Sequence, residues 1–240
     1  MEYVKTWRDD GVAWVQLARP DKANALNAGL VEELVHAVAG AGDDEGIHTL
    51  VLCGAGRSFC GGFDLSGLDD ETDASLAYRF LRVERLLQAV AHAPLYTVAV
   101  AHGPVSGAGA DLVAACRRRI GSPDAVFRFP GSRFGVVLGT RRLRELLGPR
   151  AYSVVLEQKA LDADRARQIG LLDQVAAADE WPELVRGIAE RVRLIPETTR
   201  RQITAMDSAR HLEDIGQLAE SVAIPGLRER IRAYRETLKK

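Results

Sequence analysis

Two glycine-rich segments, each directly after a short apolar run typical of a strand, have the clearest chemical use in this chain. They cover residues 54–62 (GAGRSFCGG) and 103–109 (GPVSGAG). Because glycine has no side chain, backbone N–H groups in such loops can point outward without obstruction. Two loops of this kind that meet would form a pair of donors for a developing oxyanion. Spacing alone favours the plainer alternative, in which the glycines only permit tight turns.

Two known glycine-containing motifs do not match these loops. A dinucleotide-binding G-x-G-x-x-G sequence starting at Gly54 would need a third glycine where the chain has Phe59, and a long polar segment follows in place of a helix. The G-x-S-x-G sequence of serine hydrolases is also absent around Ser106, because Pro104 occupies the place of its first glycine. Ser106 is therefore expected to be a small residue in a tight turn.

The overall charge gives the chain little attraction for a polyanion. Among its 240 residues, 32 Lys and Arg nearly balance 33 Asp and Glu, so the formal net charge at pH 7 is −1. Neither nucleic acid nor a membrane is therefore expected as a partner. With 47% hydrophobic and 27% charged residues, the composition is that of a soluble globular protein. The length favours one domain with an appendage over two equal domains.

The cysteines and the apolar stretches indicate a cytoplasmic protein. Cys53, Cys60 and Cys116 are odd in number and show no C-x-x-C spacing, which argues against a disulfide framework and against a metal site. The N-terminus shows no signal-peptide pattern. The longest apolar stretch, residues 93–101, is far shorter than the ~20 residues that a membrane-spanning helix needs.

The hydrophobic pattern predicts an alternation of strands and helices that ends in a helical quarter. Strands are expected at residues 12–17, 49–53, 96–101, 125–129 and 171–175. One helix is expected to start after a cap at Asn27 and to stop at Gly40 and Gly42. Further helices are expected at residues 74–91, 107–116, 141–147, 151–158 and 163–169. Beyond residue 176 only helical patterns occur, as in a tail that packs on the body or on a partner subunit.

Three segments closely resemble the signature segments of the enoyl-CoA hydratase/isomerase (crotonase) superfamily. They are residues 19–27 (RPDKANALN), 58–65 (SFCGGFDL) and 102–112 (HGPVSGAGADL), and their order and spacing also match. The resemblance covers essentially the whole chain and implies an α/β crotonase-like fold, a spiral of ββα units in two roughly perpendicular sheets. It further implies a core over residues 1–179 and a C-terminal helical region over residues 180–240 that mediates assembly into a homotrimer or a dimer of trimers.

The resemblance also implies a ligand and its binding residues. The superfamily binds acyl-CoA thioesters, as in fatty acid metabolism, so coenzyme A would enter as part of the substrate and no separate cofactor is implied. The thioester oxygen would lie between the backbone N–H groups of Phe63 and Ala108. Phe63 is bulkier than the usual small residue, so its ring would narrow the acyl pocket. The candidate CoA-contact and loop residues are Lys22, Ala23, Asn24, Ala25, Gly61, Gly62, Asp64, Leu65 and Gly107.

The catalytic carboxylates are where the chain departs from the superfamily. Its hydratases use two glutamates, the first of which falls on Asp111 and the second on Gly131. Hydration needs one group to accept a proton from water and another to supply one near Cα, whereas a double-bond shift needs a single base. The loss at Gly131 weakens the hydratase interpretation, and it also weakens the isomerase interpretation because isomerases of the superfamily tend to keep the second glutamate. An acidic residue near a helix N-terminus is the alternative interpretation of Asp111.

Three functions therefore remain open from the sequence. We expect hydration or double-bond shift of an enoyl-CoA, with Asp111 as the acid/base. The alternatives are a catalytically silent acyl-CoA-binding protein and a thioester hydrolase in which Asp111 activates water. His102 and Arg133 are near these segments in the sequence and are candidates to replace the lost carboxylate, although a lone histidine is more commonly a packed, hydrogen-bonded residue.

Overall fold

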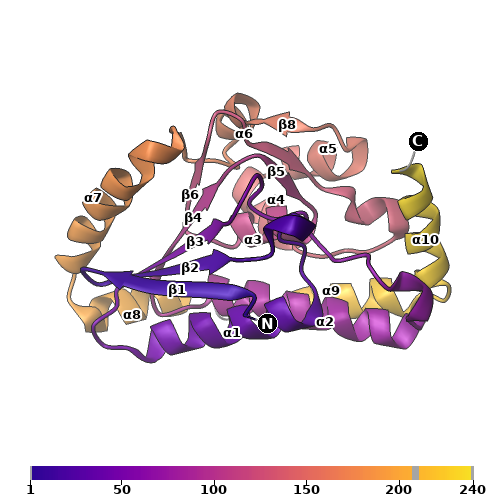
Figure 1. Cartoon of the computed structure of the whole chain (residues 1–240), viewed down its shortest axis with the longest axis horizontal. Coiled ribbons are helices and arrows are strands. Elements are labelled where there is room, and N and C mark those ends of the chain that lie inside the picture. The colour runs from indigo at the N-terminus through magenta and orange to yellow at the C-terminus, as the bar shows by residue number, and fades with distance from the viewer. Residues whose placement is uncertain (1, 207–210, 239–240) are drawn as a thin grey trace.

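The computed structural model, which describes residues 2–206 and 211–238, contains two β-sheets surrounded by helices (Figure 1). The six-stranded sheet has, in spatial order, the strands β1 (Val4–Asp9), β2 (Val12–Leu17), β3 (Thr49–Gly54), β4 (Tyr96–Ala101), β6 (Arg118–Gly121) and β9 (Gln174–Val175). The β1/β2 pair is antiparallel and every other neighbouring pair is parallel. The smaller sheet has the strands β5 (Pro104–Ser106), β7 (Val126–Arg128) and β8 (Leu161–Asp162).

Ten α-helices connect and cover these strands within the described residues. The helices of the body are α1 (Ala28–Asp43), α2 (Asp73–Ala91), α3 (Ala108–Ala114), α4 (Thr140–Leu147), α5 (Arg150–Glu157) and α6 (Ala163–Ile169). The C-terminal quarter forms α7 (Trp181–Arg193), α8 (Glu197–Ala205), α9 (His211–Ala223) and α10 (Leu227–Thr237). A short 3-10 helix, η3 (Pro130–Phe134), follows β7 and forms part of the site described below.

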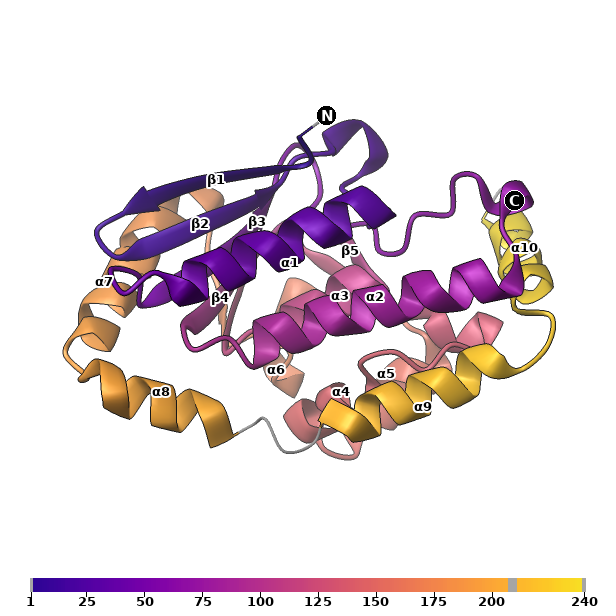
Figure 2. The same cartoon turned by 90° about the horizontal axis from the view of Figure 1, so that it is seen from below.

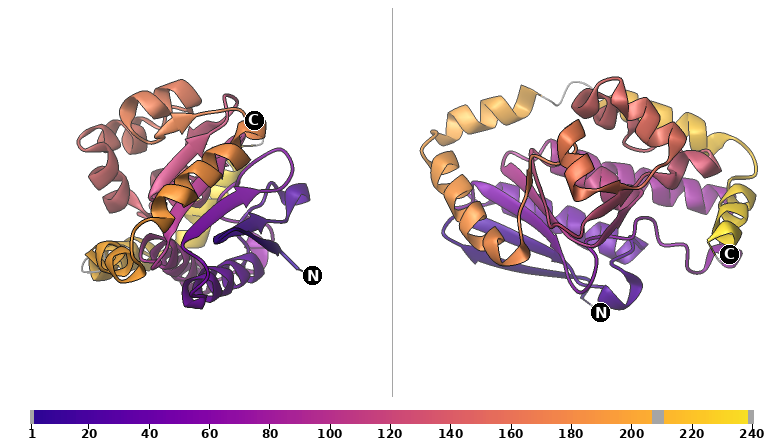
Figure 3. Two further views of the ribbon diagram at one scale, coloured as in Figure 1. Left: turned by 90° about the vertical axis from the view of Figure 1, so that its left-hand side faces the viewer. Right: turned by 90° about the horizontal axis from the view of Figure 1, so that it is seen from above.

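Both faces of the six-stranded sheet are covered. Leu50 and Leu52 of β3 pack with Leu34 of α1 in the larger core cluster. Val51, which lies between them, packs with Trp181 of α7 on the opposite face, where Figure 3 shows α7 against the sheet. Successive side chains of a strand point to opposite faces, so a strand covered on both sides is apolar throughout. This explains why β3 and β4 appear in the sequence as continuous apolar runs.

All five predicted strands are present, but four further strands were missed. Strands β2 and β4 have the predicted bounds, whereas the strands predicted at residues 125–129 and 171–175 are shorter than expected. The missed β1 is an edge strand whose side chains after Val4 are exposed, so it lacks an apolar pattern. The missed β6 contains the buried Arg119, whose charge is paired with Asp173 at 2.7 Å.

Helix α1 confirms one boundary and corrects the other. The Asn27 side chain accepts a hydrogen bond from the N–H of Leu30 at 2.8 Å, as expected of a cap. The predicted stop at Gly40 and Gly42 is wrong, because the helix continues to Asp43. A Cβ at Gly42 would lie only 3.2 Å from the ring of Pro94. The glycine allows the helix to pack closely there, and this packing outweighs its low helix propensity.

The C-terminal helices pack back on the body of the same chain. Figure 2 shows α9 running beside α2, and the two helices are in contact. The carboxylate of Asp73, at the start of α2, accepts hydrogen bonds from the N–H groups of Gly226, Leu227 and Arg228 at 2.7–3.1 Å. Leu218 and Ile231 share a core cluster with Phe80 and Phe134 of the body. Among the described helices none has the length and apolar character to cross a membrane.

Candidate active site

The two glycine-rich loops meet backbone against backbone. The N–H of Ser106 donates to the carbonyl of Cys60 at 3.0 Å. A Cβ at Gly109 would lie 2.5 Å from that same Cys60 oxygen, and a Cβ at Gly62 would lie 2.5 Å from the Ser106 oxygen. Gly62 also has φ +92°, a conformation that favours glycine. The glycines therefore allow the close approach of the two loops in addition to their turns.

Two backbone N–H groups remain without an acceptor where the loops meet. The residues on either side of Phe63 form backbone hydrogen bonds with Leu26. The N–H of Leu26 donates to the Gly62 carbonyl at 2.7 Å, and the N–H of Asp64 donates to the Leu26 carbonyl at 3.2 Å. The Phe63 N–H itself has no acceptor among the described residues. Ala108 is the first residue of α3, so its N–H also lacks an intrahelical acceptor. Both residues line one cavity of about 240 Å³, and paired donors of this kind can stabilise an oxyanion.

Asp111 lines the same cavity from the first turn of α3. The residue is 6% exposed, and its carboxylate forms no hydrogen bond or ion pair with the described part of the chain. Burial raises the pKa of the Asp111 carboxyl well above its usual range; the positive charge of Arg142 opposes this shift and the negative charge of Glu84 adds to it. A buried carboxyl with a raised pKa, free of fixed partners and facing a cavity, is suited to proton transfer.

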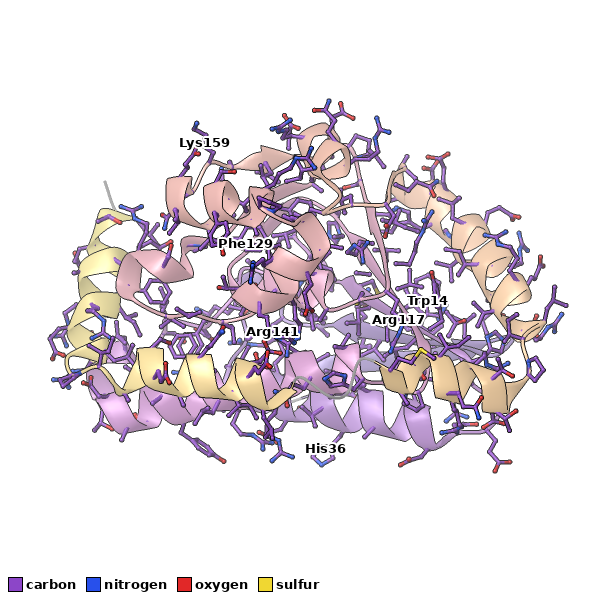
Figure 4. All side chains as sticks on the ribbon, turned by 180° about the vertical axis from the view of Figure 1, so that it is seen from behind. Trp14, His36, Arg117, Phe129, Arg141 and Lys159 are labelled. Carbon is purple, nitrogen blue, oxygen red and sulfur yellow. The ribbon has the colours of Figure 1, made fainter. Side chains whose placement is uncertain are left out.

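A network of buried ion pairs fixes helix α4, which follows the cavity-lining segment at Gly139. Glu84 of α2 pairs with Arg142 of α4 at 2.5 Å, and Arg142 also pairs with Asp214 of α9 at 3.0 Å. Arg141, seen in Figure 4 where α4 meets α9, pairs with Asp214 at 2.6 Å. Since each buried charge has a partner, the network holds the start of α4 against α2 and α9 without leaving an uncompensated ion.

Gly139, the residue before α4, lies directly against Asp111. Its φ is +65°, and a Cβ built on it would lie 2.5 Å from Oδ1 and 2.7 Å from Cγ of Asp111. We expect Gly139→Ala to reduce turnover by about 10²-fold, because the methyl group would displace the carboxylate by the order of 1 Å.

Gly67→Ala is the matched control for this prediction. Gly67 has a similar φ of +69°, but no atom lies within 4 Å of its Cβ position. Both variants therefore have the same backbone strain, and only Gly139→Ala also places a methyl group against Asp111. Steady-state rates and thermal unfolding of both variants would measure the effect. Equal rates for the two would contradict the placement of Gly139 against a working carboxylate.

Gly131, where the sequence predicts the loss of a second carboxylate, also lines the cavity. It lies beside Ser132, whose hydroxyl donates to the Val155 carbonyl at 2.9 Å and accepts from the Gln158 amide at 2.6 Å. Among the described residues that line the cavity, Asp111 is the only carboxylate. The site therefore contains one obvious proton carrier.

His102 and Arg133 do not take the place of the missing group. The His102 ring packs near Trp181, with 6.0 Å between ring centroids, and its Nε2 lies 2.9 Å from the Gly56 carbonyl. Arg133 is exposed, with its guanidinium 5.5 Å from the centroid of the Tyr234 ring. Neither side chain lines the cavity, so neither is placed to act on a bound acyl group.

The predicted CoA-contact segment lies at the rim of the cavity. Lys22 and Ala23 are exposed, and the Ala23 carbonyl accepts from the N–H of Gly61, which lines the cavity, at 2.7 Å. Ala25 is half-buried, and its carbonyl accepts from the guanidinium of Arg19.

Asn24 differs from its neighbours because its side chain points into the protein. The residue is fully buried, and its amide group donates to the carbonyls of Ala55 and Ser58, each at 2.8 Å. Its side-chain oxygen accepts from the N–H of Arg19 at 2.9 Å. The Asn24 side chain therefore positions the first glycine loop and is not presented to a ligand.

Asp64 also has a positioning role in the structure. Its buried carboxylate pairs with Arg19 at 2.9 Å and accepts from the hydroxyl of Ser66 at 2.7 Å. Burial raises the pKa of Asp64, but the hydrogen bonds from Ser66 and Arg19 outweigh it, so the net pKa lies below the usual range. Asp64 does not line the cavity, whereas these predicted site residues do: Gly61, Gly62, Phe63, Leu65, Gly107, Ala108 and Asp111.

Four aromatic residues of the cavity were not predicted as site residues: Phe80, Phe129, Phe134 and Tyr234. Phe80 follows the apolar spacing of α2, which indicated only a buried helix face. Phe134 lies in η3, and Tyr234 comes from α10 more than a hundred residues after the loops. The bulky Phe63 was the one sequence signal of an aromatic cavity.

Comparison with known proteins agrees with the fold and the site. The family model described as "Enoyl-CoA hydratase/isomerase" matches residues 8–223, and the chain belongs to this family. "Probable enoyl-CoA hydratase echA6" of Mycobacterium leprae is 38% identical over 190 residues, 75% of each chain. "Probable enoyl-CoA hydratase echA14" of Mycobacterium tuberculosis is 31% identical over 242 residues, 94% of each chain.

A solved structure confirms the crotonase-like fold. The crystal structure titled "putative enoyl-CoA hydratase/isomerase" from Bordetella parapertussis superposes with a TM-score of 0.93 at 41% sequence identity. The match covers 97% of this chain and 98% of the other. The two-sheet α/β architecture predicted from the three signature segments is therefore correct.

Proposed function

We propose that this protein processes acyl-CoA thioesters and that it shifts the double bond of an enoyl-CoA between the β,γ and α,β positions. The single observation that carries this choice is the presence of one carboxylate, Asp111, among the described residues that line the cavity. A double-bond shift needs a single base, whereas hydration needs a second group. The loss at Gly131 weakens both interpretations, but it weakens hydration more, because the remaining Asp111 can by itself move a proton from Cα to Cγ. Membership of the enoyl-CoA hydratase/isomerase family supports the acyl-CoA part of the proposal.

The proposed mechanism uses the two loop amides and Asp111. The ionised Asp111 takes a proton from Cα of the β,γ-unsaturated thioester, and the electrons move into a dienolate whose charge rests on the thioester oxygen. The N–H groups of Phe63 and Ala108 donate to that oxygen. Asp111 then returns the proton to Cγ, which leaves the conjugated α,β-enoyl thioester. Each such backbone donor contributes about 10²–10³-fold to the rate in other enzymes.

Product analysis of one incubation tests this proposal. Purified protein with a 3-enoyl-CoA is expected to form the conjugated 2-enoyl-CoA, detected by its absorbance and by chromatography. Gain of one water by a 2-enoyl-CoA would indicate hydration in its place, and release of the free CoA thiol would indicate hydrolysis. Either of these as the main product would contradict the double-bond shift.

Restoring a carboxylate at position 131 is expected to add hydratase activity. Gly131 does not have a positive φ, so glutamate fits its backbone, and the nearest obstacle to a Cβ is the Val136 carbonyl oxygen at 3.2 Å. A second general acid/base is typically worth about 10²–10⁴-fold, so Gly131→Glu should raise hydration of crotonyl-CoA by up to that range. Gly131→Gln is the control, because glutamine has the shape of glutamate but cannot take up or release a proton in the reaction. Equal hydration by the two variants would contradict the role given to this position.

The raised pKa of Asp111 has a consequence for stability. The unfolded carboxyl ionises near pH ~3.9, whereas the folded one ionises only at a higher pH because burial favours its neutral form. As the pH rises above ~3.9, the unfolded chain therefore binds fewer protons than the folded chain, and stability falls until Asp111 itself ionises. Asp111→Asn should raise the melting temperature at pH 7, with a gain that shrinks towards pH ~4. A variant less stable than the parent at pH 7 would contradict this.

A catalytically silent acyl-CoA-binding protein is the second candidate function. The observation that favours it is Gly131, which leaves the cavity without the second glutamate of the family's hydratases. Retained acyl-CoA affinity without turnover of either 2-enoyl or 3-enoyl thioesters would support this function and overturn the first.

We also propose assembly into a homotrimer or a dimer of trimers. Large apolar side chains are exposed along the C-terminal helices in a single chain: Leu194, Ile203, Met206 and Leu212 are 55–80% exposed. Exposed apolar groups in one region favour contact with another subunit. The mass of the purified protein in solution, measured by light scattering, tests this.

A further inference from the structure

Four aromatic rings form a continuous row along one wall of the cavity. Phe63 and Phe80 are stacked, with ring centroids 4.1 Å apart and an interplanar angle of 14°. Phe80 is followed by Phe134 at 6.4 Å, and Phe134 by Tyr234 at 5.1 Å. All four residues line the cavity, and the row begins at the residue whose N–H faces the proposed thioester oxygen. We call this row the aromatic wall.

The aromatic wall is held in place before any ligand binds. The guanidinium of Arg79 lies 4.3 Å from the centroid of the Phe63 ring, which Phe80 also stacks against. Arg79 is itself fixed by Glu71 at 2.6 Å and by the carbonyl of Asp64 at 2.8 Å. Because Phe63 is fixed by these neighbours, a ligand that uses this wall loses little free energy to side-chain ordering.

The cavity has space beside the aromatic wall. Gly131 contributes no side chain on the side where the family's hydratases carry a glutamate, and this leaves room next to the rings. An acyl group that extends into this space from the N–H groups of Phe63 and Ala108 lies beside the aromatic wall.

We propose that the acyl group of the natural substrate carries an aromatic ring on a short chain, as in a 4-aryl-3-butenoyl thioester, whose Cγ can receive the proton in the double-bond shift. The inference rests on the proposed function, since it takes the thioester to lie at the N–H groups of Phe63 and Ala108. A ring bound in the cavity would lie against the aromatic wall in an offset-stacked or edge-to-face arrangement. Each such pair strengthens binding about two- to tenfold beyond the area it buries.

Binding of unreactive saturated thioesters tests the inference separately from catalysis. Calorimetry would compare 4-phenylbutanoyl-CoA with 4-cyclohexylbutanoyl-CoA, which has the same carbon skeleton without the aromatic ring, and with the straight-chain decanoyl-CoA. The phenyl thioester is expected to bind about two- to tenfold more tightly than each of the others. Equal affinities for the phenyl and cyclohexyl thioesters, or tighter binding of decanoyl-CoA, would overturn the inference.

Two leucine substitutions show whether the aromatic wall causes the preference. Phe80→Leu removes the ring that joins Phe63 to Phe134, so the phenyl and cyclohexyl thioesters should then bind equally. Phe127→Leu is the matched control: Phe127 is fully buried but does not line the cavity, so the preference should remain. If Phe80→Leu does not fold, as judged by thermal unfolding, Phe134→Leu replaces it. A preference that survives in both wall variants would overturn the inference.

The outcomes also separate this inference from the function it rests on. If all three thioesters bind without a preference for the ring, the proposed acyl-CoA function stands and only the substrate class is wrong. If none of them binds, both the function and the substrate class are overturned.

Discussion

Asp111→Asn is expected to lower the rate of the double-bond shift by about 10²–10⁴-fold while leaving acyl-CoA binding nearly unchanged. Asparagine has the size of aspartate but cannot accept and return a proton at Cα and Cγ. Asp111 is the only carboxylate among the described lining residues, so no neighbour there can take over its role. The loss should appear in kcat, measured with a 3-enoyl-CoA, and not in the affinity for a saturated acyl-CoA.

Asp69→Asn is the control for this substitution. Asp69 is exposed and pairs with Arg232 and Arg235 outside the cavity, so the same chemical change there should leave the rate unaltered. Because Asp111→Asn is expected to stabilise the fold at pH 7, unfolding would not explain a loss of activity. An Asp111→Asn protein that keeps its rate would show that another group moves the proton.

Gly109→Ala is expected to lower kcat/KM by about 10²–10³-fold, the usual effect of removing one oxyanion donor. Gly109 does not have a positive φ, so alanine fits its backbone. The added methyl group would nevertheless lie 2.5 Å from the carbonyl oxygen and 2.8 Å from the Cβ of Cys60. Since Cys60 is buried, the two loops must separate, and the N–H groups of Phe63 and Ala108 can then no longer face one oxygen.

Gly40→Ala is the matched control for the second loop. Gly40 also lies inside a helix, but no atom is within 4 Å of its Cβ position. Alanine there should leave activity unchanged and stabilise the helix by up to about 1 kcal/mol. If Gly109→Ala and Gly40→Ala were equally active, the close contact between the loops would not be needed for function.

The local parts of the fold and the site could be predicted from short stretches of sequence. Apolar runs located β2, β3 and β4 because most of their residues are buried. The glycine loops and the three signature segments located Phe63, Ala108 and Asp111, which the structure brings to one cavity. These features depend on neighbouring residues, whose pattern is visible in a single sequence.

Other parts depend on contacts between distant segments and left no local signal. Glu84, Arg142 and Asp214 belong to three helices, and only their packing shows that each charge has a partner. Tyr234 lines the cavity because α10 folds back on the body. Asn24 illustrates the converse: its position in a signature segment indicated a CoA contact, but its amide is used by loop carbonyls.

A crystal structure with a bound saturated acyl-CoA would test the central claim most directly, because that ligand cannot react. We expect the thioester oxygen to lie about 2.7–3.1 Å from both the Phe63 and the Ala108 nitrogen, with Asp111 as the carboxylate nearest to Cα. A thioester oxygen that contacts neither nitrogen, or an acyl group bound outside the cavity, would contradict the claim that these loops form the active site.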